Sequence, residues 1–263
     1  MKTILRIFIF FLFAQHLEAQ QIIHQSFNSE VLKEKRDIWI WLPPNFQADQ
    51  EYPILYMMDG QNLLYDSLAY AGTWQIPSKL QELHTEGLDL IVVAVANAGS
   101  GKGRSKDYSW FKSDGNPSGK GEEFLSFMCE ELIPEIESTY KTIPGKRGIM
   151  GSSLGGLISI QALIEHPDIF QLGGIFSASF WFNPESMEES YLSRIQKSQK
   201  IYLIIGENEG GGIPMANDQR KASAILDKYL ETDHIHAEVF PDGDHKEWFW
   251  AREFVPAVKF LYH

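Results

Sequence analysis

Residues 151–155 of this 263-residue chain, Gly-Ser-Ser-Leu-Gly, have the form G-x-S-x-G. In that form a serine stands at the tip of a sharp turn from a strand into a helix, where its hydroxyl is exposed. Glycines flank it because a Cβ at those positions would collide with the neighbouring strand and helix. The motif predicts Ser153 as a nucleophile if a strand precedes it, a helix follows it, and an acid and a histidine come later in the chain.

A serine hydroxyl is a weak nucleophile until a neighbouring imidazole accepts its proton. Among the eight histidines, His245 lies late in the chain, in the turn-rich loop 241–245 that follows a predicted strand. His234 and His236 alternate at the start of that strand, but no third ligand stands at matching spacing, so we predict no metal site there. We expect His245 to be the base; the alternative is an exposed loop histidine.

An acid must orient the imidazole and offset the charge that it gains, and its place is between the serine and the histidine in the sequence. Glu207 and Glu209 follow the apolar run Ile201–Ile205. Either glutamate could serve. Glu209 lies farther out on the turn, nearer the loop from which His245 must be reached, so we favour Glu209 and keep Glu207 as the second choice.

A tetrahedral intermediate would also need donors for its oxyanion, and the loss of one donor costs about 3 kcal/mol. The backbone amide of Leu154 directly follows the serine. A second donor is expected from the loop after an earlier strand, where Gly60 and Gln61 offer amides beside a glycine that permits close approach. We predict these amides as the oxyanion hole, with Asp59 as a structural acid of the turn.

Apolar runs alternate with segments of helical spacing along the rest of the chain, without a linker or a repeat. Continuous apolar runs suit strands buried on both faces, as in a parallel sheet. The pattern predicts one three-layer α/β domain over residues 20–263. The predicted strands are Arg36–Leu42, Tyr52–Met58, Leu90–Ala96, Arg147–Met150, Leu172–Phe176, Lys200–Ile205 and His236–Phe240. The predicted helices are Trp74–Leu83, Gly121–Tyr140 with an interruption at Pro134, Leu154–Glu165, Asp218–Leu230 and Glu247–Leu261.

Two further features are expected at the carboxyl edge of this sheet, where open α/β sheets bind ligands. Gly99–Gly121, the longest irregular connection, is either a lid or a solvated loop. Phe180, Trp181 and Phe182 follow the predicted strand Leu172–Phe176. They could form an apolar wall for an acyl or aryl group, or they could belong to the core.

The first 19 residues have the layout of a cleavable secretory signal. Lys2 and Arg6 precede the apolar run Ile7–Ala14, and cleavage is expected after either Ala19 or Gln20. The run is much shorter than the roughly 20 apolar residues that a membrane anchor needs. We therefore expect the remainder of the chain to be secreted or periplasmic, without a membrane anchor.

The formal net charge of −12 at pH 7 opposes binding to nucleic acid or to anionic lipid heads. The single cysteine, Cys129, excludes an internal disulfide. It lies in an apolar helical pattern, where a small buried residue is expected rather than a nucleophile.

Six segments resemble the Putative esterase family, which is similar to esterase D and includes feruloyl, acetylxylan and enterochelin esterases. These segments are Leu55–Asn62, Arg104–Tyr108, Glu131–Pro134, Met150–Gly156, Ser177–Trp181 and Asp242–Trp248. The resemblance implies an α/β-hydrolase fold and a serine ester hydrolase without a cofactor, whose partner is a small-molecule or oligosaccharide ester substrate. It also implies Ser153 as the nucleophile, His245 as the base, and the acid at the third position after Gly206. That acid, Glu209, is commonly Asp in the family.

Three functions are compatible with these observations. The first is an exported ester hydrolase that acts on acyl or aromatic esters of carbohydrate. The second is a hydrolase of a cyclic catecholate siderophore ester, whose negative charge Arg104 and Lys106 could help to bind. The third is a non-catalytic binding protein of the same fold, which the intact serine, histidine and acid disfavour.

Overall fold

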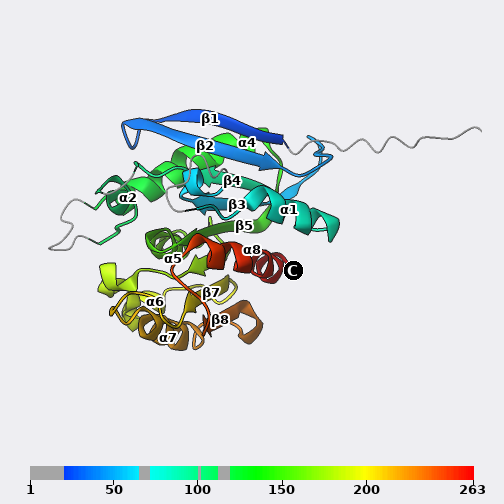
Figure 1. The fold of residues 1–263 in the computed structure, drawn as a ribbon. Coiled ribbons are helices and arrows are strands. Elements are labelled where there is room, and N and C mark those ends of the chain that lie inside the picture. The colour runs from blue at the N-terminus through cyan, green and yellow to red at the C-terminus, as the bar shows by residue number, and fades with distance from the viewer. Residues whose placement is uncertain (1–20, 65–71, 100–101, 112–118) are drawn as a thin grey trace, which may run out of the picture.

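The computed structural model describes residues 21–64, 72–99, 102–111 and 119–263. The expected signal segment and its cleavage position lie outside the described residues, as do residues 100–101 and 112–118 of the predicted irregular connection Gly99–Gly121. Within its described part the prediction is wrong over Lys102–Asp107, which form a short helix. The described strands form one eight-stranded sheet with helices around it (Figure 1). Within the described part of the chain, no helix is long and apolar enough to cross a membrane.

The strand order in the sheet is β1-β2-β4-β3-β5-β6-β7-β8. β2 pairs antiparallel with β1 and with β4, and the remaining neighbours pair parallel. The carboxyl ends of the six parallel strands therefore meet at one edge. The strands are β1 (Gln21–Ser29), β2 (Glu34–Leu42), β3 (Tyr52–Met58), β4 (Ile91–Val95), β5 (Thr142–Ser152), β6 (Leu172–Phe176), β7 (Lys200–Gly206) and β8 (Ile235–Phe240).

Both faces of the central strands are buried, as their continuous apolar runs predict. In β3, Leu55 and Met57 pack into a cluster with α1 and α8, whereas Ile54, Tyr56 and Met58 pack into the cluster on the opposite face, with α3, α4, α5 and α7. This alternation confirms the three-layer architecture. The helices are α1 (Ile76–Thr85), α2 (Lys102–Asp107), α3 (Gly121–Ser126), α4 (Ile133–Thr139), α5 (Leu154–Glu165), α6 (Glu189–Leu192), α7 (Met215–Leu226) and α8 (Glu247–Tyr262).

The predicted helix Gly121–Tyr140 is interrupted, as the proline within it indicates. Between α3 and α4, residues Phe127–Leu132 form a π-helix, and the Ile133 amide donates to the carbonyl of Met128, five residues back. Pro134 follows at the start of α4, where its missing amide is tolerated. Cys129 lies in the π-helix, half-buried, and burial raises the pKa of its thiol to about 12.

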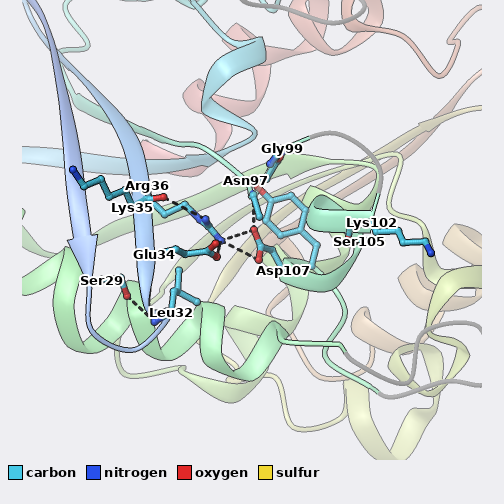
Figure 2. Close-up of polar contacts among 12 residues, drawn as sticks. Ser29, Leu32, Glu34, Lys35, Arg36, Asn97, Gly99, Lys102, Ser105 and Asp107 are labelled. Carbon is cyan, nitrogen blue, oxygen red and sulfur yellow. Dashed lines mark hydrogen bonds and ion pairs between the residues drawn. The ribbon is translucent and has the colours of Figure 1, made fainter.

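The π-helix carries Glu131, which anchors the turn of the β1–β2 hairpin. Its carboxylate accepts hydrogen bonds from Ser29 Oγ at 2.6 Å and from the amides of Glu30 at 2.9 Å and Val31 at 3.1 Å. Ser29 Oγ in turn accepts from the amide of Leu32 at 2.9 Å (Figure 2). One side chain thus satisfies the backbone of a turn about a hundred residues away in sequence.

Replacing Glu131 by alanine should lower the free energy of unfolding by about 1–3 kcal/mol, because three donors lose a charged acceptor. Chemical denaturation measures this change. The matched control is Glu135→Ala, an exposed acid in the first turn of α4, which should cost only a few tenths of a kcal/mol. Equal losses in the two variants would contradict the anchoring role.

Candidate active site

Ser153 lies at the sharp turn between β5 and α5, as the G-x-S-x-G motif predicts. Its backbone has φ 59° and ψ −122°, a conformation that costs free energy for a residue with a Cβ. The turn is held by the Ser153 amide, which donates to the carbonyl of Phe176 at 2.9 Å. A Cβ on Gly151 would lie 2.6 Å from the carbonyl carbon of Gly155, so this position requires glycine. The strained turn places the serine hydroxyl at the carboxyl edge of the sheet.

His245 lies between Ser153 and Glu209 in one hydrogen-bonded chain. Its Nδ1 is 2.6 Å from Glu209 Oε2, and its Nε2 is 3.0 Å from Ser153 Oγ. A carboxylate can only accept, so Nδ1 carries the proton and the Nε2 of the neutral ring is free to accept one from the serine. The arrangement can activate the serine hydroxyl.

The two glutamates after β7 have different surroundings. The Glu209 side chain is fully buried, and its Oε1 accepts from the Gly206 amide at 2.7 Å and from Ser177 Oγ at 2.8 Å. Glu207 instead forms an exposed ion pair with Arg220 of α7. The structure therefore brings Glu209, and not Glu207, to the histidine.

Three residues that sequence reasoning missed support this chain. Trp250 Nε1 donates to Ser177 Oγ at 2.9 Å, so Ser177 can direct its own proton to Glu209. Ser179 Oγ lies 3.2 Å from Ser153 Oγ. Ser177 has a φ of 46°, another strained conformation beside the site. Ser177 and Ser179 lie in the segment Ser177–Trp181 that carries the family resemblance, whereas Trp250 lies just beyond the segment Asp242–Trp248 and had no such signal.

The predicted oxyanion donors lie on two turns at the same edge. Leu154 begins α5, and the first amides of a helix have no partner within it. Gly60 and Gln61 begin a short 3₁₀ turn after β3. The first backbone hydrogen bond of this turn is donated by the Asn62 amide, to the carbonyl of Asp59 at 2.8 Å. The three predicted amides therefore all stand at the beginnings of helical turns.

The aromatic residues after β6 separate into two environments. Phe180 is 1% exposed and packs in the core, so it has no surface for a ligand. Trp181 is 43% exposed and forms an edge contact with Phe182, with ring centroids 5.7 Å apart. Of the three residues predicted as an apolar wall, Phe180 is buried, Phe182 packs half-buried against the core, and Trp181 presents an exposed face.

Arg104, predicted to bind substrate, forms a paired contact with Asp59. Its Nε donates to Asp59 Oδ1 and its Nη2 to Oδ2, both at 2.8 Å. Burial opposes the charge of the guanidinium, but the Asp59 carboxylate outweighs this effect and raises the pKa of Arg104. Partial burial also raises the pKa of nearby Glu247, although the charge of Arg104 favours its carboxylate.

One group of possible metal ligands occurs among the described residues, formed by Glu231, Asp233 and His234. These residues precede β8 and so lie at the amino end of that strand, opposite His245. His236, the other histidine considered for a metal, stacks on Tyr202 with ring centroids 4.5 Å apart. Glu231, Asp233 and His234 therefore take no part in the hydrogen-bonded array of Ser153, His245 and Glu209.

Comparison with known proteins identifies the family. The family model described as "Putative esterase" matches residues 29–261 of this chain. Among curated relatives, the ferri-bacillibactin esterase BesA of Bacillus subtilis (strain 168) is 26% identical over 207 residues, which cover 70% of this chain and 69% of that protein.

Two solved structures show the same fold. The feruloyl esterase module from Clostridium thermocellum, in complex with sinapinate, matches with a TM-score of 0.70 and 16% identity, covering 94% of this chain and 89% of that one. An IroE-like serine hydrolase from Shewanella oneidensis matches with a TM-score of 0.72 and 22% identity, covering 93% and 80%. The expectation of an α/β-hydrolase fold is confirmed.

Exchange of the two glutamates for glutamine distinguishes their roles. Glu209→Gln should lower kcat for a chromogenic acetate ester by orders of magnitude, because an amide cannot hold the imidazole in its working tautomer or offset its charge. Glu207→Gln, the matched control, should cost less than about tenfold, or 1.4 kcal/mol in the barrier. Steady-state kinetics of both variants measure the difference.

The reverse order of effects would assign the acid to Glu207. Two unaffected variants would mean that Ser153 and His245 act as a dyad.

Proposed function

This chain belongs to the Putative esterase family and is a carboxylic ester hydrolase, and we propose that it cleaves its substrate through the triad Ser153, His245 and Glu209. The observation that carries the proposal is the continuous chain of contacts from Glu209 Oε2 through the imidazole to Ser153 Oγ, at 2.6 and 3.0 Å. The proposed reaction needs no cofactor.

In the first half of the reaction, Ser153 Oγ attacks the ester carbonyl carbon while His245 Nε2 takes its proton. The carbonyl oxygen becomes an oxyanion, for which the amides of Leu154, Gly60 and Gln61 are the proposed donors. The imidazolium then protonates the leaving alcohol, and the acyl group remains on the serine. Glu209 stabilises the imidazolium without being protonated itself.

In the second half, water replaces the alcohol. His245 accepts a proton from this water, which attacks the acyl carbon, and the acid product leaves as the serine recovers its proton. Because the histidine side chain is 32% exposed while Glu209 is fully buried, water can approach from the imidazole side of the site.

For the substrate, we favour a neutral acyl or aromatic ester of a carbohydrate. We also propose that the protein is exported. Trp181 offers an exposed aromatic face for an aryl group or a sugar ring. The charge of Arg104 is already paired with Asp59, and Glu247 adds a carboxyl group beside the site. A strongly anionic ligand would therefore find little uncompensated positive charge in these residues.

A siderophore ester is the second candidate, and the similarity to the ferri-bacillibactin esterase favours it. A panel of methyl ferulate, acetylated xylan and enterobactin separates the two. We expect the highest kcat/KM with one of the carbohydrate-type esters; a preference for enterobactin would select the second candidate.

Ser153→Ala should abolish hydrolysis of a chromogenic acetate ester and leave the melting temperature nearly unchanged, because the serine stands on a strained turn for access rather than for packing. Initial rates and thermal unfolding measure the two effects. Residual activity above about a thousandth of wild type would point to another nucleophile, such as Ser152, because loss of a triad member costs at least that much.

Trp181→Ala should raise KM for methyl ferulate roughly three- to tenfold, the range of an aromatic contact, and change KM for an acetate ester less. The matched control is Trp248→Ala, since Trp248 is 47% exposed and its ring faces Arg252 at 5.5 Å. The KM values of Trp248→Ala for both esters should stay within twofold of the wild-type values. Equal effects of Trp181→Ala on both esters, with a large loss of stability, would mean a packing role.

A further inference from the structure

Arg104 joins the turn that follows β3 to the end of the nucleophile strand. Besides its two contacts with Asp59, its Nη2 donates to the backbone carbonyl of Ser152 at 3.1 Å. Ser152 directly precedes Ser153, and Asp59 directly precedes Gly60. A single guanidinium thus holds the two segments that carry the proposed oxyanion donors.

Asp59 adopts a backbone conformation that needs such support. Its φ is 60°, in the left-handed region, which costs free energy for a residue with a Cβ. Its amide donates to the hydroxyl of Tyr108 at 3.0 Å, and its Oδ1 accepts from Asn97 Nδ2 at 2.6 Å. Asp59 is therefore fixed by Arg104 of α2, by Tyr108 directly after α2, and by Asn97 in the loop after β4.

The turn that begins at Asp59 is also wedged tightly between its neighbours. A Cβ on Gly60 would lie 2.7 Å from the carbonyl carbon of Ala94 in β4, and one on Gly155 in α5 would lie 3.0 Å from Asp59 Oδ2. The carboxylate therefore reaches the first turn of the helix whose opening amide belongs to Leu154. A shift of Asp59 would change the spacing between the two sets of amides.

The helix that carries Arg104 is anchored at its far end by a second buried ion pair. Arg36 of β2 and Asp107 of α2 point toward one another, with Nη2–Oδ1 and Nη2–Oδ2 distances of 3.1 and 2.9 Å (Figure 2). Asp107 also accepts from the amide of Ala98 at 2.7 Å. Both side chains of the pair are 3% exposed. These contacts hold α2 in place, and Arg104 extends from it to the site.

We propose that Arg104, through Asp59, is a positioning residue that sets the distance between the amides of Gly60 and Gln61 and the amide of Leu154. This inference rests on the proposed serine mechanism. Oxyanion donors act only when they meet the transition state at hydrogen-bond distance, and a displacement of about 1 Å can cost roughly a hundredfold. Arg104 therefore acts on the rate of the chemical step rather than on substrate affinity.

The test compares Arg104→Gln and Asp59→Asn with Arg147→Gln. Arg147 is the matched control because it makes a similar paired contact, with Glu137 at 2.6 Å for both bonds, near the middle of β5, five residues before Ser152. Rates on p-nitrophenyl acetate and methyl ferulate are normalised to active sites titrated by the acylation burst. The inhibition constant of phenylboronic acid, which forms a tetrahedral adduct on Ser153, is measured in parallel.

We expect kcat per active site to fall about ten- to hundredfold in the Arg104 and Asp59 variants, with KM for both esters within about twofold. The boronic acid should bind more weakly by a similar factor. Arg147→Gln should lower the melting temperature and leave kcat within twofold. Arg104→Lys keeps the charge but not the paired geometry and should lose part of the activity, so it carries the test if Arg104→Gln does not fold.

Two results would overturn the inference. One is a normal kcat per active site with only a lower melting temperature, as in the Arg147 control. The other is a raised KM with unchanged kcat, which would make Arg104 a substrate-binding group. Failure of the serine mechanism itself is distinguishable, because it would appear as activity that survives Ser153→Ala in a protein whose Arg104 and Asp59 are unchanged.

Discussion

A fully buried carboxylate is the constraint on which the site depends. The Glu209 side chain has no exposure to solvent, so the hydrogen bonds of water must be replaced by donors from the protein. Those donors are the Gly206 amide, Ser177 Oγ and His245 Nδ1. Each comes from the end of a different parallel strand or from the loop after it. The hydrogen bonds that stabilise the Glu209 carboxylate therefore also hold the His245 imidazole within hydrogen-bond distance of Ser153 Oγ.

Much of the fold follows from local patterns. The predicted bounds of β3, α5 and β6 agree with the structure, because a continuous buried run defines each strand and the G-x-S-x-G turn and Pro167 limit the helix. β1 was missed, since Gln21–Ser29 is a half-exposed edge strand whose polar and apolar residues give no continuous run. Chain order restricted the site to Ser153, His245 and two glutamates, because parallel strands bring their carboxyl ends together.

The remaining features depend on partners far apart in the sequence, which no local pattern encodes. Ser177 and Trp250 are 73 residues apart, and Arg104 lies 45 residues from Asp59. A lone arginine in a polar stretch resembles a ligand group until its carboxylate partner is known. Phe180 and Trp181 are adjacent in the chain, yet one is 1% and the other 43% exposed, because the turn after β6 directs them to opposite sides.

Covalent labelling of the nucleophile tests the central claim most directly. The protein is treated with a fluorophosphonate, digested, and its peptides are mapped by mass spectrometry. Activation of Ser153 by the imidazole predicts a single adduct, on Ser153, which forms in the wild-type protein and is strongly reduced in His245→Ala. An adduct on Ser152 or Ser179, or labelling of Ser153 that is equally fast without His245, would contradict the account.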